Sequence, residues 1–373
     1  MCRSHKNRCC KKKVVKQVPD VNIFAFGDSF TDPGNWPYEI PPGPQVPISF
    51  DAPIPNGQVL QVRFNGEGAN SDGLLYPSFV SQDLGLEMLK GSKVKKVRGK
   101  GKFVNFALSG ASQTQVAAVV IGGLVPPVPY YGSYQWQIDT FTQLMANSPC
   151  ASVTKDDIFL YHAVGDNDFR ILTFLLPFQV DVPAFVQAQV DLYVNSTVAN
   201  LTSLYNKGMR RCFLVIYDED PNTSPYYIKS AIASGDRAGT LAFFTDILLG
   251  NPFGNPGLQP ALNAYLDANA AALWPGMELV RLNMSSYLNH LINNAPLNGI
   301  VLPYGETFPG SDLFNTQAGV GAWPASEPYP TGNVANLYAI DDVHLTQHSN
   351  KLVADVVTQW FAPLKTKTVC KKY

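Results

Sequence analysis

Residues 21–35 read VNIFAFGDSFTDPGN, and this stretch decides the fold class of the chain. It begins with an apolar run that ends at Phe26 and continues into small and polar residues, the pattern of a buried strand followed by a turn. Ser29 lies at that junction, where a turn toward a helix would present its hydroxyl. A helix N-cap is the simpler explanation of Ser29 alone, so its interpretation depends on what other strand ends carry.

Further short apolar segments alternate with helical patterns along the chain. Each apolar segment is nearly continuous, which is typical of strands buried on both faces of a parallel sheet. Such alternation predicts right-handed crossovers and an α/β fold, a three-layer α/β/α sandwich around a five-stranded parallel sheet. The predicted strands cover residues 22–26, 103–107, 158–164, 212–217 and 278–282, and the predicted helices cover 134–145, 182–206, 258–273 and 347–361.

Three segments are too long to be simple connections between strands and helices. Residues 33–70, 120–132 and 294–336 are rich in Gly, Pro and aromatic side chains. Loops of this length are usually functional or disordered. No internal repeat or linker is evident, so we expect one domain with long loops at 21–363, flanked by basic tails at 1–20 and 364–373.

The composition excludes several classes of protein. The chain has a net charge of −1 and only 15% charged residues, whereas a nucleic-acid-binding protein normally has a basic face. No apolar run is long enough to predict a transmembrane helix. The six cysteines match no zinc-ligand spacing. Cys150 and Cys212 could form a disulfide, but two separately buried thiols are the favoured interpretation.

The N-terminal segment MCRSHKNRCCKKKVVK is basic and lacks the apolar core of a signal peptide. Acylation of its cysteines beside Lys and Arg would give peripheral contact with an anionic membrane. A solvated, disordered tail is the simpler alternative. The sequence therefore leaves the localisation of the protein undetermined.

Small and polar residues follow the other predicted strands. Ligands of open parallel sheets bind beyond the carboxyl ends of the strands. Gly110 follows the second strand, where a glycine lets a backbone N–H approach a substrate closely. Asn167 follows the third strand and would hold an amide donor over the same crevice. Asp341 and His344 precede the last helix at i and i+3, so the carboxylate can reach the imidazole.

Together these residues meet the requirements of acyl transfer. Ser29 would attack an ester carbonyl, His344 would move the proton to the leaving alcohol, and Asp341 would fix the imidazole tautomer. The backbone N–H groups of Ser29 and Gly110 and the amide of Asn167 would form the oxyanion hole. This chemistry needs no metal and no organic cofactor, and its partner is a small-molecule or lipid ester.

The order of these motifs resembles the GDSL (SGNH) esterase/lipase family. FGDSFTDPGN is most similar to the plant-type and related microbial lipase branch, and NFALSGAS resembles its NFAVGGA segment. The resemblance covers residues 22–361 and implies an SGNH hydrolase domain with a flavodoxin-like sandwich. Phe30, Ser109 and Leu345 depart from the family pattern, but none of these changes removes a proposed proton-transfer group or donor.

The leading hypothesis is a serine hydrolase that cleaves lipid, short-chain or acetyl esters through an acyl-enzyme. One alternative is a phospholipase/acyltransferase that passes the acyl group to an alcohol, which water exclusion by the long loops would favour. Another is an inactive, ligand-binding member of the fold, which the complete set of site residues argues against.

Other titratable residues have simpler structural interpretations. His344 and His348 lie four residues apart, but no Glu base and no third ligand accompany them, so a metal site is disfavoured. His162 lies inside an apolar run and is interpreted as a core histidine with satisfied hydrogen bonds. Asp342 could exchange roles with Asp341. Aromatic loop residues could line an acyl or sugar site or pack within the loops: Trp36, Tyr38, Tyr130, Tyr131 and Trp323.

Overall fold

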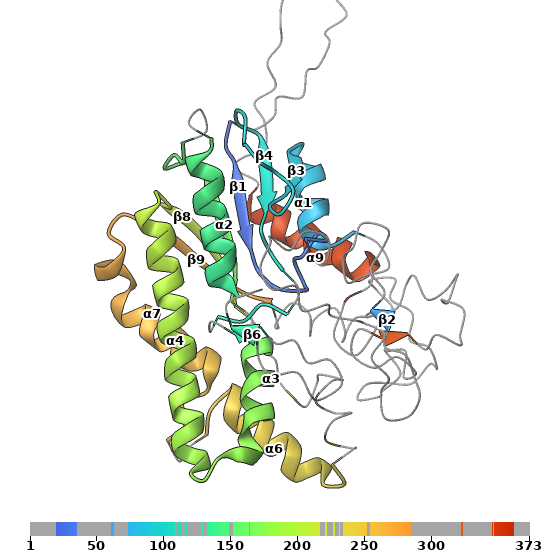
Figure 1. Cartoon of the computed structure of the whole chain (residues 1–373), viewed down its shortest axis with the longest axis vertical. Helices are drawn as coiled ribbons and strands as arrows, with labels where there is room; N and C mark the ends of the chain where they lie inside the picture. The colour runs from blue at the N-terminus through green and yellow to red at the C-terminus, as the bar shows by residue number, and fades with distance from the viewer. Residues whose placement is uncertain are drawn as a thin grey trace, which may run out of the picture.

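A parallel sheet lies at the centre of the computed structural model, with helices on both of its faces (Figure 1). In the part of the chain that the structure describes, the sheet has six strands in the order β3-β4-β1-β7-β8-β9, and every neighbouring pair is parallel. The strands are β1 (Ile23–Phe26), β3 (Glu87–Lys90), β4 (Lys102–Asn105), β7 (Ile158–Ala163), β8 (Arg211–Ile216) and β9 (Glu278–Asn283). The described residues are 20–35, 61–62, 74–108, 110–113, 116–117, 128–129, 133–148, 152–163, 165–216, 221, 227, 231, 234–251, 254–284, 322–323, 345 and 347–361.

The predicted fold class, an α/β fold with a parallel sheet between helical layers, is confirmed, but the predicted count of five strands is wrong. The additional strand is β3, with the sequence EMLK, at the edge of the sheet. Its first residue is exposed and the other three are only partly buried. An edge strand needs less apolar surface than a central one, so β3 lacks the apolar run that marks the others.

The central strand β1 is buried on both faces. Its four residues, IFAF, are all buried. Phe24 and Phe26 belong to one apolar cluster, and Ile23 and Ala25 belong to the other. Successive side chains of a strand point to opposite faces, so the two clusters lie on the two sides of the sheet. This explains why the strand sequence is continuously apolar rather than alternating.

Helices α2 (Tyr134–Ala146), α4 (Val182–Asn206) and α7 (Leu258–Leu273) contribute to the first cluster. Phe141 of α2 packs edge-on against Phe24, with ring centroids 5.1 Å apart. Edge-to-face geometry is favourable for aromatic pairs, and a buried phenylalanine of this kind stabilises a domain by about 3–5 kcal/mol relative to alanine. Helix α2 is therefore fixed against the middle of the sheet.

Helices α1 (Tyr76–Leu84) and α9 (Gln347–Trp360) cover the second face. They come from distant parts of the chain but lie side by side, as Figure 1 shows. The side chain of Asn350 accepts a hydrogen bond from Tyr76 N at 3.1 Å and donates one to Leu345 O at 3.1 Å. Through Asn350, Leu345 is thereby linked to the start of α1.

The four predicted helices are present, with ends within one residue of the expected positions. Asp181 caps α4 by accepting a hydrogen bond from Ala184 N at 3.1 Å, and the helix stops before Gly208, whose φ is 106°. Helix α1 is absent from the sequence-based prediction, as are α3 (Asp166–Leu175) and α6 (Arg237–Leu248).

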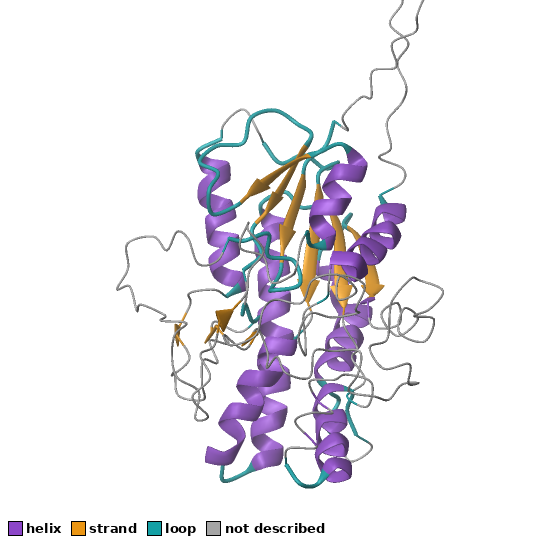
Figure 2. Ribbon diagram, turned by 90° about the vertical axis from the view of Figure 1, so that its right-hand side faces the viewer, coloured by secondary structure: helices purple, strands orange, loops and turns teal. Residues whose placement is uncertain are grey.

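Helices α3 and α6 and one half of α4 extend beyond the carboxyl ends of the strands (Figures 1 and 2). Helix α3 continues into the short 3-10 helix η1 (Leu176–Phe178) before the chain reverses into α4. These helices therefore flank the carboxyl edge of the sheet, where the candidate site is expected.

Two-residue strands occur in and near the long predicted loops. β2 (Gln61–Val62) pairs antiparallel with β10 (Ala322–Trp323), and β5 (Val116–Ala117) pairs with β6 (Val128–Pro129). The β2–β10 pair joins loop 33–70 to loop 294–336, which are far apart in the sequence. The rest of these loops largely lies outside the described residues.

The proposed tails 1–20 and 364–373 lie outside the described residues apart from Asp20, and the domain boundaries stay predictions. Among the described helices, none combines the length and apolar character needed to cross a membrane. Cys212 is a free thiol buried in β8, and burial raises its pKa. Cys150 lies outside the described residues.

Candidate active site

The turn that follows β1 presents Ser29 at the carboxyl edge of the sheet. The carbonyl oxygen of Asp28 accepts hydrogen bonds from Thr31 N at 3.0 Å and Asp32 N at 2.9 Å. The Asp28 carboxylate also accepts one from Phe30 N at 3.0 Å. Asp28 is buried, whereas Ser29 is partly exposed. The turn is therefore closed around Ser29 and leaves its side chain accessible.

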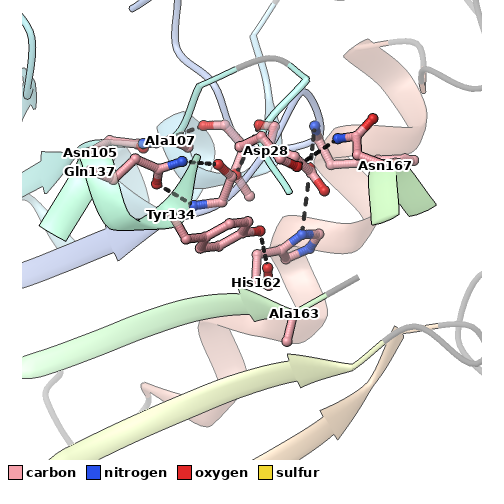
Figure 3. Close-up of polar contacts among 12 residues, drawn as sticks. Asp28, Asn105, Ala107, Tyr134, Gln137, His162, Ala163 and Asn167 are labelled. Atoms are coloured by element: carbon pink, nitrogen blue, oxygen red, sulfur yellow. Dashed lines mark hydrogen bonds and ion pairs between the residues drawn. The ribbon is translucent and has the colours of Figure 1, made fainter. Parts of the chain in front are cut away.

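Gly27 connects this turn to the sheet and admits no side chain. A Cβ atom at this position would lie 1.9 Å from Thr31 Oγ1 and 3.0 Å from His162 Cβ. The side-chain amide of Gln137 in α2 bonds both backbone polar groups of Gly27 (Figure 3). Its Oε1 accepts from Gly27 N at 3.0 Å and its Nε2 donates to Gly27 O at 2.7 Å. The sequence does not reveal this role of Gln137, because no local pattern links residues 110 positions apart.

Two asparagines join the Ser29 turn to the segment that follows β4. Asn35 Nδ2 donates to Asn105 O at 2.9 Å and to Ala107 O at 2.8 Å. In return, Asn105 Nδ2 donates to Thr31 O at 2.7 Å. Both asparagines are buried, so these bonds are protected from water. Asn35 ends the FGDSFTDPGN motif and Asn105 begins the NFALSGAS motif. Their presence in these motifs is the sequence signal that could have identified them.

Gly110 lies in the turn after β4, next to the Ser29 turn. Leu108 N donates to Gly27 O at 3.1 Å, and Ala111 N donates to Leu108 O at 3.1 Å. Gly110 has a φ of 79° and is partly exposed. This left-handed conformation is disfavoured for other residues, which accounts for a glycine at the position. The turn brings the Gly110 backbone to the same edge as Ser29.

Asn167 lies in the first turn of α3, directly after β7. The N-cap of α3 is Gly165, so helix capping does not explain Asn167. Its Nδ2 donates one hydrogen bond to Ala111 O at 2.8 Å. Next to it, the Asp168 carboxylate accepts one from Gln113 N at 3.0 Å. A side-chain amide carries two N–H donors, so the Ala111 bond orients the amide and leaves a second donor.

The structure thus brings Ser29, Gly110 and Asn167 to the ends of three neighbouring strands, β1, β4 and β7. Asp341 and His344 lie outside the described residues, as does Asp342. Leu345, the residue after His344, is buried in the second apolar cluster. In the described part of the chain, no three His, Cys, Asp or Glu side chains gather as metal ligands.

Residues 23–357 match the family described as GDSL-like lipase/acylhydrolase. The chain belongs to this family. The predicted resemblance is therefore confirmed, and the family supports ester hydrolysis as the general reaction.

Plant members of the GDSL family are among the chain's relatives. Acetylajmalan esterase 2 of Rauvolfia serpentina is 30% identical over 218 residues, which is 56% of this chain and 54% of the relative. A GDSL esterase/lipase of Arabidopsis thaliana is 25% identical over 358 residues, covering 90% of this chain and 85% of the relative. The chain thus spans about half the length of the first relative and most of the second.

Behind the Ser29 turn of this GDSL-family chain lies a buried histidine, His162. His162 is a core residue as expected, but its Nδ1 has no hydrogen-bond partner among the described residues. This nitrogen lies 3.7 Å from Asp28 Oδ1. Burial, and secondly the charge of Asp28, raises the pKa of Tyr76 and of Tyr134 well above the usual value.

A hollow of about 450 Å³ lies between the start of α4 and the end of α6. Its walls include Val182, Val186 and Phe243, and none of the described site residues Ser29, Gly110 and Asn167 is among the lining residues. It is therefore separate from the Ser29 site. Trp36, Tyr38, Tyr130 and Tyr131, named above as aromatic loop residues, lie outside the described residues.

Proposed function

We propose that this chain is a serine hydrolase that cleaves carboxylic esters through an acyl-enzyme intermediate. The observation that carries the proposal is the gathering of Ser29, Gly110 and Asn167 at three adjacent strand ends. A nucleophilic hydroxyl and two independent donors at one edge are among the parts that acyl transfer requires.

In this mechanism, Ser29 Oγ attacks the ester carbonyl carbon and transfers its proton to His344. His344 then gives that proton to the leaving alcohol, and Asp341 stabilises the imidazolium. A water molecule deacylates Ser29 by the same proton transfers in reverse order. The positions of Asp341 and His344 just before α9 and the anchoring of Leu345 beside α1 are consistent with this assignment.

The tetrahedral oxyanion would accept hydrogen bonds from Ser29 N–H, Gly110 N–H and the second N–H of Asn167. The Ala111 and Gln113 bonds support this role, because they fix the Asn167 amide and the Gly110 turn relative to each other. Donors that are oriented before the reaction need no reorganisation when the charge develops.

The names of two relatives guide the choice of ester. Two relatives of the chain are named acetylajmalan esterases, which supports acetyl esters as one class of substrate. Turnover of a panel of nitrophenyl esters, acetylated sugars and phospholipids would identify the acyl length and the alcohol. We expect the short-chain esters to have the highest kcat/KM.

Ser29→Ala tests the assignment of the nucleophile. The variant should fold normally, because the partly exposed hydroxyl contributes little to the core, and should lose ester hydrolysis. Wild-type turnover in the folded Ser29→Ala protein would refute the proposal.

A phospholipase/acyltransferase is a second candidate. The β2–β10 pair ties two long loops together, and a closed loop cover would exclude water in favour of an alcohol acceptor. Product analysis with added alcohol separates the two reactions: transesterification that exceeds hydrolysis at low alcohol concentration indicates a transferase.

A further inference from the structure

A second acid–imidazole pair lies directly beneath the proposed nucleophile. Asp28 and His162 come from the ends of adjacent strands β1 and β7, and both side chains are almost completely buried. His162 Nδ1 lies 3.7 Å from Asp28 Oδ1, and the imidazole points toward the carboxylate in Figure 3. Neither group has a role in the mechanism described above.

The Asp28 carboxylate has few partners for a buried acid. Among the described residues it accepts one hydrogen bond, from Phe30 N at 3.0 Å. Asp157, a buried carboxylate at the opposite end of the same sheet, accepts bonds from Asn22 N at 2.7 Å, Thr154 N at 2.8 Å and the Lys100 ammonium at 2.7 Å. Burying a carboxylate is costly unless it is paired and hydrogen-bonded. The Asp157 carboxylate is thus paired with a cation and several donors, whereas the Asp28 carboxylate would gain stability from a further hydrogen-bond donor.

His162 is the available donor. Its ring is held between Phe30 and Tyr76, with ring centroids 6.2 Å and 6.0 Å away. Its backbone carbonyl is fixed by a hydrogen bond from the Tyr134 hydroxyl. The ring cannot move far, and its Nδ1 has no other acceptor among the described residues. A shift of less than one ångström would complete a bond to Asp28.

We propose that the Asp28–His162 pair positions the nucleophile: His162 Nδ1–H donates to the Asp28 carboxylate and holds the backbone of the Ser29 turn in its reactive geometry. The Asp28 carbonyl oxygen accepts hydrogen bonds from Thr31 N and Asp32 N, which form the turn. The same peptide group carries the N–H of Ser29, a proposed oxyanion donor. His162 is thus a positioning residue that acts through Asp28. The inference rests on the proposed function of Ser29.

Two His162 variants test the bond. His162→Phe keeps a ring between Phe30 and Tyr76 but removes the donor, and kcat for a nitrophenyl ester should fall about 10- to 100-fold with little change in KM. The rate at which a fluorophosphonate labels Ser29 should fall in parallel. His162→Gln restores an amide donor and should recover part of both rates.

Asp28→Asn tests the same bond from the other side. If the two residues act as one unit, the double variant Asp28→Asn/His162→Phe should be no slower than the slower single variant. Asp157→Asn is the matched control, because it removes a buried carboxylate from the same sheet far from Ser29. It should lower the Tm while leaving kcat and the labelling rate unchanged.

The pH profile of kcat/KM distinguishes positioning from direct catalysis. In His162→Phe, the ionisation of the proposed base should persist while the plateau falls. Loss of that ionisation would make His162 the base and overturn the proposal. Unchanged kcat and labelling in folded His162→Phe and Asp28→Asn would also overturn it. If His162→Phe does not fold, Asp28→Asn and His162→Gln decide the matter.

Wild-type labelling is measured first, which separates the two proposals. Wild-type protein that is not labelled at Ser29 refutes the nucleophile assignment and this inference with it. Normal wild-type labelling with unaffected variants refutes the positioning pair alone.

Discussion

Asn167 is the proposed oxyanion donor whose geometry is best defined by its neighbours. One N–H of its amide is used by Ala111 O at 2.8 Å, which fixes the direction of the other. The same Ala111–Gln113 segment follows Gly110 and is tied to Asp168. At the level of single residues, these bonds thus link two proposed donors, Asn167 and Gly110, that follow different strands.

Asn167→Ala should lower kcat about 10²- to 10³-fold and change KM much less, because the lost bond forms mainly in the transition state. Steady-state kinetics on a short ester would measure both constants. Asn269→Ala removes a helical asparagine whose amide bonds Tyr265 O at 2.9 Å, and it should leave kcat unchanged. A change confined to KM in Asn167→Ala would contradict the oxyanion role.

The sequence predicted the location of Ser29, Gly110 and Asn167 because each follows an apolar strand, and parallel strands end at one edge. It could not predict Gln137 or the pairing of His162 with Asp28. Both contacts depend on how α2 and β7 pack against β1, which no local pattern encodes. The glycine at position 27 is one sign of such close packing, since a Cβ there would meet both Thr31 and His162.

At the level of elements, α2 supports the Ser29 turn. Its Phe141 packs against the aromatic cluster on β1, and its Gln137 bonds both polar groups of the Gly27 peptide. A buried backbone group without a partner costs about 1–3 kcal/mol. Gln137 and Phe141 lie one helical turn apart, so neighbouring turns of α2 contribute to the stability of the fold and to the geometry of the site.

Gln137→Ala should lower the free energy of unfolding by about 1–3 kcal/mol, because Gly27 N–H loses its buried acceptor. Denaturant titration would measure the change. Gln135→Ala is the control on the same helix, since among the described residues the Gln135 amide bonds Asp139 alone, at 2.9 Å on a partly buried face. Equal stability of the two variants would contradict the supporting role of Gln137.

The elements found from sequence are those with a strong apolar pattern. β1 and β7 are buried at every position and are therefore clear in the sequence. β3 is an edge strand with the sequence EMLK, and α3 begins inside the GDND motif that reads as a turn. Both were missed because their local sequences resemble a surface segment and a loop.

The whole molecule is held by apolar clusters on both faces of one sheet, with helices from both halves of the chain. α1 and α9 cover one face together, and Asn350 of α9 bonds Tyr76 N at the start of α1. We expect the buried tyrosines Tyr76, Tyr134 and Tyr161 to make this assembly sensitive to alkaline pH. Burial is the largest cause that raises the pKa of each well above 10.0.

Stability should fall as the pH rises above about 10, the pKa of tyrosine in the unfolded chain. There the unfolded state loses protons that the folded state retains, so each tyrosine reduces the free energy of unfolding by about 1.4 kcal/mol per pH unit. Tyr76→Phe should reduce this slope by about one proton. Denaturant titrations between pH 8 and 11 would measure it, and a stability that stays constant or rises would contradict the account.

The central claim is that Ser29 is the nucleophile of an ester hydrolase, and mass-spectrometric mapping of a fluorophosphonate adduct tests it most directly. The account predicts one adduct on Ser29 in the folded protein and none after heat unfolding. The absence of an adduct on the folded protein, or an adduct on another residue with Ser29 unmodified, would contradict it.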